Sequence, residues 1–274
     1  MASPRWKTVV EKAIAEYKNQ TGMPSSWVQK SHAHHVDLVF QVATLEASSA
    51  SGGPKVPIPR VRSQVFRSFL TSPKLPSLPL LLSSTDIRTP KVAQLTSSTK
   101  AEVVWWIEGT KQQLRFSADV YIVPHISHPV YTIFREAVIK AGRGTGLSAF
   151  KADTDDEWEK RRIDLFHTMS PHMKASWCRP VPGSKLEGDA EEEAKRWPER
   201  IVEPDEGSMG REEYEKAKKD WEMALGNFAL VIVDPVEVDF VDLSSPPDRR
   251  SLFTKKVQSE EDDRVIWEEV NLVP

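Results

Sequence analysis

The feature that most limits the fold of this chain is a run of strand-like segments with almost no helix between them. The segments are rich in β-branched and aromatic residues and cover Val36 to Leu45, Arg62 to Leu70, Leu78 to Ser83, Ala101 to Ile107 and Gln112 to Val123. Parallel neighbours would need a crossover helix at every step, and the run contains only one short helix signal, at Thr89-Pro90. The sequence therefore predicts an antiparallel barrel.

Helices are predicted before and after this run, and strands return near the C-terminus. Ser3-Pro4 begins a first helix that ends before Gly22, and helical patterns cover Pro129 to Trp177 and Glu212 to Leu225. The returning strands are expected at Phe228 to Val233, Val236 to Leu243, Leu252 to Val257 and Arg264 to Val270. Neither half has enough strands to close by itself, so we expect one domain over residues 1–274. Its class is mainly β with α (α+β), a Greek-key-like barrel with flanking helices.

One segment interrupts this pattern. Residues 183–210 hold an acidic run from Glu187 to Glu193 and several Pro and Gly residues, which predicts a solvated insertion loop. The sequence leaves its role open.

Composition excludes several classes of protein. The net charge of −3 and the mixing of basic with acidic residues give no basic stripe for nucleic acid. The single cysteine, Cys178, excludes an internal disulfide and a cysteine-built metal site. No apolar run approaches the roughly 20 residues of a membrane-spanning helix. The N-terminus resembles neither a secretory signal nor a transit peptide. We therefore expect a cytoplasmic protein that binds neither nucleic acid nor membrane.

Cationic and hydroxyl residues gather at strand ends and at the predicted helix start. They are Arg62, Arg67, Ser84, Thr85, Arg88 and Lys91, with apolar strands between them. Side chains that stay protonated at neutral pH, together with helix amides, are what a phosphate dianion requires. The pattern predicts a site for a planar cofactor that carries a phosphate.

These segments resemble the pyridoxamine 5′-phosphate oxidase-like FMN-binding split-barrel family, in its branch of oxidase-related FMN-binding domains. Arg62-Ser-Gln-Val-Phe-Arg67 is similar to the family's Arg-x-Val-x-x-Lys/Arg strand, and Ser84-Thr85 through Lys91 to its phosphate segment. Gln113 takes the place of a Gln that binds the pyrimidine edge of the flavin. Asp248-Arg249 resembles the family's late Asp/Asn-Arg, whose Arg approaches FMN from across the barrel. The resemblance implies FMN as cofactor, a split barrel, and a homodimer with the flavin between subunits. The cofactor-binding residues that it implies are Arg62, Ser63, Gln64, Val65, Phe66, Arg67, Ser84, Thr85, Arg88, Lys91, Gln113 and Arg249.

This sequence differs from the oxidases of the family in the residues that contact the substrate and the flavin face. Residues 165–172 hold no Tyr-Arg pair for a substrate phosphate, the late Arg-x-His motif is replaced near Pro246-Pro247, and the Trp that packs on the flavin is replaced near Val241. The resemblance thus implies an FMN-binding flavoprotein of the FMN-dependent oxidoreductase type, with substrate and electron acceptor open and no catalytic residue assigned. The alternative is a non-catalytic flavin-binding or interaction protein that retains the barrel.

Other motifs favour structural roles. His32, His34 and His35 lack an acidic or cysteine partner at ligand spacing, so no metal site is predicted. Residues 142–146 (Gly-Arg-Gly-Thr-Gly) imitate a dinucleotide fingerprint but follow a helix, which favours a flexible loop. His167 and His172 are either helix-end residues or proton donors at a substrate entrance. Of Trp105 and Trp106, one is expected in the core and the other at an interface or pocket wall.

Overall fold

The computed structural model describes residues 2–21, 38–47, 56–257 and 265–274. Its described strands are β1 (Val39–Glu46), β2 (Ile58–Val65), β3 (Ser68–Leu70), β4 (Leu80–Asp86), β5 (Lys100–Ile107), β6 (Gln112–Val123), β7 (Phe228–Asp242), β8 (Arg249–Val257) and β9 (Val265–Leu272). Its described helices are α1 (Arg5–Thr21), α2 (Pro90–Ser97), η3 (Glu108–Thr110), α3 (Pro129–Lys140), η4 (Gly146–Phe150), α4 (Asp155–His167), α5 (Pro171–Ser176), α6 (Ala190–Ala194) and α7 (Arg211–Asn227).

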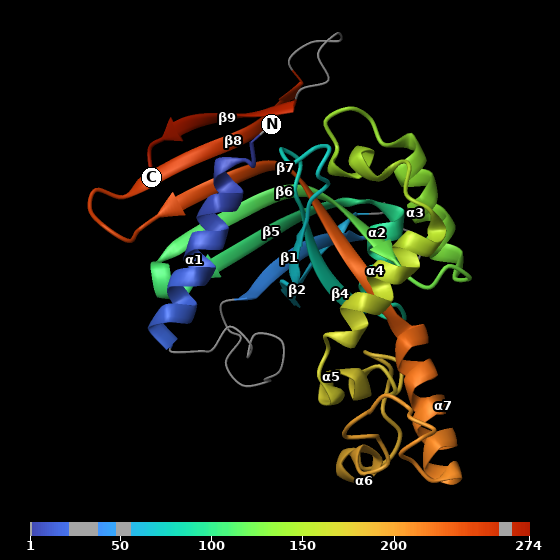
Figure 1. The fold of residues 1–274 in the computed structure, drawn as a ribbon. Helices are drawn as coiled ribbons and strands as arrows, with labels where there is room; N and C mark the ends of the chain where they lie inside the picture. The colour runs from blue at the N-terminus through green and yellow to red at the C-terminus, as the bar shows by residue number, and fades with distance from the viewer. Residues whose placement is uncertain (1, 22–37, 48–55, 258–264) are drawn as a thin grey trace.

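The described strands form one antiparallel sheet in the order β2-β1-β5-β6-β7-β4-β3, with β8 paired to β7 and β9 paired to β8. The sheet curls on itself because β3, at one end of this order, follows β2, at the other end, after only two residues. At that junction Arg67 N donates to Leu82 O at 2.8 Å, and Ser83 Oγ donates to Gln64 Oε1 at 3.0 Å. The predicted antiparallel α+β barrel is confirmed (Figure 1).

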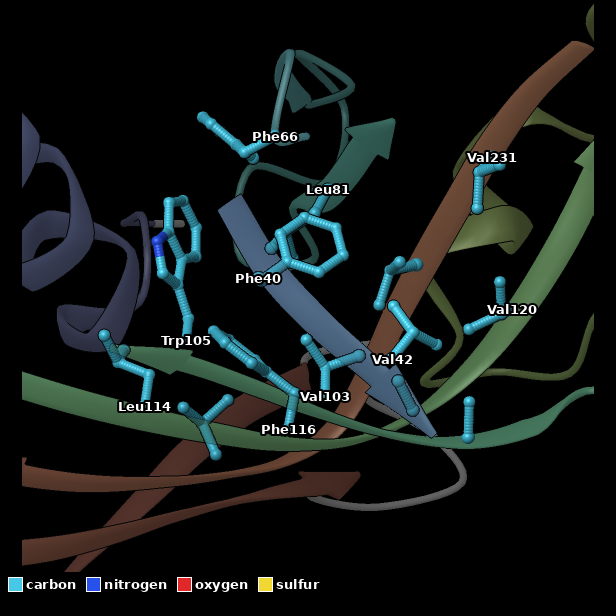
Figure 2. Packing of buried hydrophobic residues seen from close by; sticks show 14 of the residues in the cluster. Phe40, Val42, Phe66, Leu81, Val103, Trp105, Leu114, Phe116, Val120 and Val231 are labelled. Carbon is cyan, nitrogen blue, oxygen red and sulfur yellow. The ribbon is translucent and has the colours of Figure 1, made fainter. Parts of the chain in front are cut away.

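The barrel is filled by inward-facing apolar side chains, shown in part in Figure 2. Phe40, Trp105 and Phe116 are fully buried there, whereas Trp106, on the opposite face of β5, is 36% exposed. The alternation of side chains along a strand explains this difference. As predicted, one of the two tryptophans is a core residue.

Helix α1 packs one apolar face on this core. Trp6, Val10 and Ala13 are buried, and the ring of Trp6 lies edge-on to Trp267 of β9 at 5.5 Å between centroids. The predicted N-terminal helix, ending before Gly22, is confirmed.

Two predicted strand boundaries are wrong. Residues 62–70 form two strands, β2 and β3, because the chain turns at Phe66-Arg67 to cross from one edge of the sheet to the other. Conversely, β7 continues through Pro235, where a break was expected. Ser117 pairs with Glu237 and Ala118 with Pro235, so Val236 is the extra residue of a bulge. Such a bulge accommodates a proline, which has no N–H to donate.

A second apolar cluster lies outside the barrel, where α3, α4, α5 and α7 cover the outer faces of β4 and β7 (Figure 1). The predicted insertion at residues 183–210 is mostly exposed, as expected, and contains the short helix α6. It is not wholly solvated, because Ile201 is 3% exposed and belongs to this cluster.

The last residue of the glycine-containing segment at residues 142–146 is packed against the barrel. Gly146 N donates to Asp234 Oδ2 at 2.6 Å, and a Cβ on Gly146 would approach Leu80 to within 2.3 Å. This hydrogen bond anchors the end of the segment at Gly146, whereas residues 142 and 143 are exposed, and the flexibility of the loop stays a prediction.

Candidate functional site

A cleft of about 550 Å³ lies where the ends of β2 and β4 meet the start of α2. These elements form its floor, and α5 with the segment after it forms the facing wall. The predicted site residues that line the cleft are Ser63, Gln64, Val65, Arg67, Ser84, Thr85 and Lys91. The structure thus brings together residues from three separate segments.

The turn between β2 and β3 decides which side chains face the cleft. Phe66 N donates to Leu38 O at 2.7 Å, and the Phe66 ring packs in the barrel core against Trp105 at 4.9 Å between centroids. Val65 and Arg67, on either side, line the cleft. The predicted residue Phe66 is therefore a core residue in this structure.

Lys91 lines the floor of the cleft, and the predicted residue Arg62, which does not line it, lies close behind as a neighbouring cation. Arg62 donates to Thr44 Oγ1 and, at 2.6 Å, to Gln94 Oε1, while Lys91 Nζ donates to Thr85 Oγ1 at 2.7 Å. The pKa of Lys91 is lowered to about 8, first by burial and then by the positive charge of Arg62, while Asp86 opposes the shift. Within the described ranges neither cation forms an ion pair with a carboxylate.

The start of α2 adds hydrogen-bond donors beside this pair. Pro90 is the first residue of the helix, and the N-cap residue Thr89 makes no side-chain capping bond. Thr89 lines the cleft together with Lys91. First-turn amides carry partial positive charge, so this end of α2 suits an anion.

Arg67 is another half-buried cation, and its two side-chain contacts are with neutral groups. Its Nε lies 3.4 Å from Ser84 Oγ and its Nη2 lies 2.8 Å from the thioether sulfur of Met173. Burial lowers its pKa to about 10, so the guanidinium still carries its charge at neutral pH. No carboxylate in the described part of the chain pairs with it.

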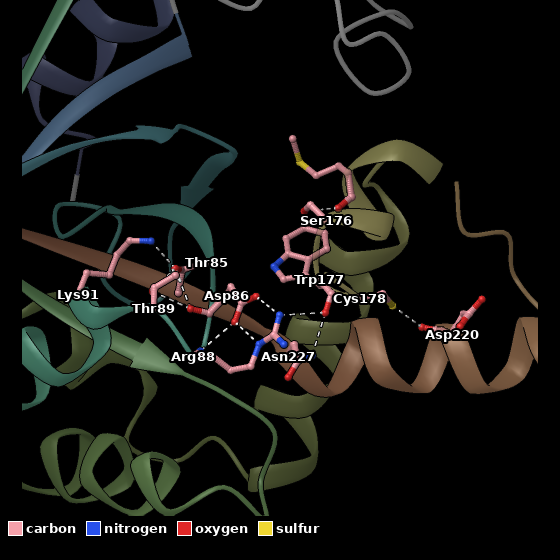
Figure 3. A network of polar contacts seen from close by, with 11 residues as sticks. Thr85, Asp86, Arg88, Thr89, Lys91, Ser176, Trp177, Cys178, Asp220 and Asn227 are labelled. Atoms are coloured by element: carbon pink, nitrogen blue, oxygen red, sulfur yellow. Dashed lines mark hydrogen bonds and ion pairs between the residues drawn. The ribbon is translucent and has the colours of Figure 1, made fainter. Parts of the chain in front are cut away.

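Arg88 points away from the cleft. Its Nε and Nη2 donate to the two oxygens of Asp86 at 3.0 and 2.6 Å, and Nη2 also lies 3.2 Å from Trp177 O. Asn227 Nδ2 donates to the same carbonyl at 2.8 Å (Figure 3). In this structure Arg88 links the floor of the cleft to its wall.

Gln113 and Arg249 lie together on another surface. Gln113 of β6 pairs with Val241 of β7, and Arg249 of β8 pairs with the next residue, Asp242. Neither residue lines the cleft of its own chain.

The other residues that line the cleft, two of the floor and the rest of the wall, were not assigned to a site by sequence reasoning. They are Asp86, Thr89, Met173, Ser176, Trp177, Arg179, Pro180, Val181, Pro182, Gly183, Ser184, Leu186 and Trp197. Most lie about a hundred positions beyond the floor in the sequence, and no local motif marks them. The spacing Asp86-x-Arg88 in the sequence could have indicated that these two side chains pair.

The histidines considered as proton donors do not line the cleft. His167 Nδ1 lies 3.5 Å from Glu203 Oε2, and its ring packs against Trp221. His32, His34 and His35 lie outside the described residues. Among the residues that are described, no group of three or more His, Cys, Asp or Glu side chains could hold a metal ion. No helix of the described chain has the length and apolarity needed to cross a membrane.

Comparisons with known proteins support the resemblance. Residues 3–124 match the family model described as pyridoxamine 5′-phosphate oxidase, FMN-binding domain. The crystal structure of a pyridoxamine 5′-phosphate oxidase-related, FMN-binding protein from Nostoc punctiforme is 19% identical, covers 100% of both chains and superposes with a TM-score of 0.59. PhzG from Burkholderia lata, solved with tetrahydrophenazine-1-carboxylic acid, is 16% identical over 87% of this chain and 83% of that one, with a TM-score of 0.45. No curated protein sequence matches significantly.

At 19% identity, the likeness to the Nostoc protein shows that the two chains share a fold. The predicted resemblance to the FMN-binding split-barrel family is confirmed by the match of residues 3–124 and by the fold.

Proposed function

We propose that this chain, whose residues 3–124 match the FMN-binding domain of pyridoxamine 5′-phosphate oxidase, binds FMN in the cleft between β2, β4 and α2. The observation that carries the proposal is the juxtaposition of Arg62 and Lys91. Two neighbouring cations without a carboxylate partner in the described residues need an anion, and a phosphate dianion matches their combined charge. The hydroxyls of Thr85 and Thr89 line the same part of the cleft, and the positive end of α2 adds to the field that favours an anion, although Pro90 has no N–H to donate.

The flavin ring would lie along the end of β2, beside residues 63–65. Arg67, half-buried and still protonated, would place its charge near the pyrimidine edge, where a cation favours the reduced, anionic ring. FMN supplies the hydride chemistry, while the protein binds the phosphate, orients the ring and keeps water from one of its faces.

We further propose a homodimer. Gln113 and Arg249, which the resemblance implies as flavin contacts, lie apart from the cleft of their own chain and would serve the cleft of a second copy. The outer face of β1 and β2 also exposes apolar side chains that a partner could cover. Leu45 is 47% exposed and Val61 67%, beside a groove of about 440 Å³.

The activity that we propose is that of an FMN-dependent oxidoreductase in the cytoplasm. One observation favours the alternative, a flavin-binding protein without turnover. The carboxylate that lines the described cleft, Asp86, is held by Arg88, and no described histidine lines it. Neither a free carboxylate nor an imidazole of the described residues is then at hand as an acid or base, which fits a protein that binds the flavin without catalysis.

Two measurements test these proposals. Purified protein mixed with FMN and freed of excess cofactor should retain flavin absorbance; a colourless protein would overturn FMN binding. Anaerobic addition of NADPH or pyridoxamine 5′-phosphate should then bleach that absorbance if the protein is an enzyme. Retained flavin that neither reductant bleaches would favour the non-catalytic alternative.

A further inference from the structure

The wall of the cleft is built by a part of the chain outside the matched FMN-binding domain. Trp177 follows α5, and Leu186 and Trp197 belong to the insertion at residues 183–210. The guanidinium carbon of Arg179 lies 5.8 Å from the centroid of the Trp197 ring, close enough for a cation–π contact. Because Trp177 is 5% exposed, the aromatic surface of the wall comes mainly from the half-buried Trp197, with one positive charge beside it.

This wall is fixed to the floor. The Trp177 carbonyl accepts hydrogen bonds from Arg88 and Asn227 (Figure 3). Arg67 Nη2 also contacts the sulfur of Met173 in α5. The wall can thus hold a small molecule at a defined distance from whatever occupies the floor.

The positive charge of the cleft exceeds what one phosphate requires. Lys91, with Arg62 close behind it, is assigned to the phosphate, which leaves Arg67 and Arg179 among the cations that line the cleft. The carboxylate among the lining residues, Asp86, is already paired with Arg88. The acidic run from Glu187 to Glu193 adjoins the wall in sequence, but none of its side chains lines the cleft. In the described chain Arg179 forms no ion pair.

We infer that Arg179 and Trp197 select the substrate of the proposed flavoprotein, and that this substrate is a planar ring bearing a single negative charge. Trp197 would stack on the ring, and Arg179, oriented by its contact with Trp197, would pair with a carboxylate. A lone exposed guanidinium suits a monoanion better than a dianion, which would need further donors. The inference rests on the proposed function, since the wall faces the place assigned to the flavin.

The test uses two probes of equal size and different charge, benzoate and benzamide, titrated calorimetrically into the full chain saturated with FMN. Benzoate should bind at least about tenfold more tightly than benzamide, as expected for one charge-assisted hydrogen-bonded pair. Arg179→Gln should remove this preference, and Arg179→Lys should keep only part of it. Trp197→Ala should weaken both probes. Arg200→Gln, an equal charge change at an exposed position of the same insertion, should leave both affinities unchanged.

The affinity for FMN, measured on the same samples, separates the two claims. Wild-type protein that fails to bind FMN removes the proposed function. Protein that binds FMN but shows no benzoate binding, or equal binding of both probes, overturns the inference alone. A preference for benzoate that survives Arg179→Gln also overturns it. Trp197→Phe, which keeps an aromatic face, replaces Trp197→Ala if the latter fails to fold, and it should retain most of the wild-type affinity.

Discussion

Lys91 Nζ donates a hydrogen bond of 2.7 Å to Thr85 Oγ1, which joins the start of α2 to the end of β4 at the floor of the cleft. Each group supplies part of a phosphate site, and the bond keeps the amine aimed at the cleft. This contact, together with the nearby Arg62, is the structural basis of the proposed FMN site.

Removing either cation should weaken FMN binding. Arg62→Ala and Lys91→Ala should each cost about 2 kcal/mol, or roughly thirtyfold in Kd, because each deletes a charge-assisted contact with the phosphate. Fluorescence titration of FMN measures this. Lys140→Ala is the control, since Lys140 is an exposed residue of α3 that pairs with Glu136. Wild-type affinity in both cleft variants would mean that the phosphate lies elsewhere.

FMN affinity should fall as the pH rises above about 8, the pKa to which burial and Arg62 lower the Lys91 amine. A neutral amine must take up a proton to compensate the phosphate, so the loss should approach about tenfold per pH unit. Arg62→Ala should move the onset of this loss to higher pH because Arg62 lowers the pKa of Lys91. Lys91→Arg, which stays charged, should make the affinity nearly independent of pH between 7 and 9.5; a decline that persists in this variant would contradict the assignment.

The same pKa predicts how stability changes with pH in the protein without ligand. The pKa of Lys91 is lower in the folded chain than its ordinary value of 10.5, so the unfolded chain binds more protons between pH 8 and 10.5. This group therefore makes stability rise with pH across that window. Urea unfolding of wild type and Lys91→Gln should differ in slope there, the variant lacking the rise. Parallel curves would show that Lys91 is not buried as described.

Arg88 should act on stability rather than directly on the phosphate. Arg88→Gln leaves the Asp86 carboxylate, which is 7% exposed on its side chain, without its forked partner and frees the Trp177 carbonyl. The expected loss in free energy of unfolding is about 2 kcal/mol. Arg88→Lys should recover part of it through charge alone. A variant as stable as wild type that binds FMN as weakly as Lys91→Ala would instead make Arg88 a phosphate ligand.

Shared sites between subunits can be detected by mixing variants. Lys91→Ala damages the cleft, and Arg249→Gln damages the surface that would serve the partner's cleft. If the site is shared, mixed dimers contain one intact site, so FMN binding should partly recover after unfolding and refolding the two variants together. Binding that stays at the level of the separate variants would argue that each cleft is complete in one chain.

Local signals account for what the sequence predicted well. Pro90 fixes the start of α2, and alternating residues fix which of Trp105 and Trp106 is buried. Long-range packing accounts for the rest. The bulge that lets β7 pass through Pro235 depends on β6, and Trp197 reaches the cleft only because α5 and the insertion fold back over β4. The sequence prediction assigned Arg88 to the phosphate from its charge and its position. In the structure its guanidinium is paired with the nearby Asp86 instead.

Comparing FMN with riboflavin in a fluorescence titration of the wild-type protein is the most direct test of the phosphate site. The two ligands share the ring and differ at the phosphate, so any difference in affinity reports on Arg62, Lys91 and the start of α2. We predict that FMN binds at least about a hundredfold more tightly than riboflavin, the combined effect of two charge-assisted contacts. Equal affinities, or no binding of either ligand, would contradict the account.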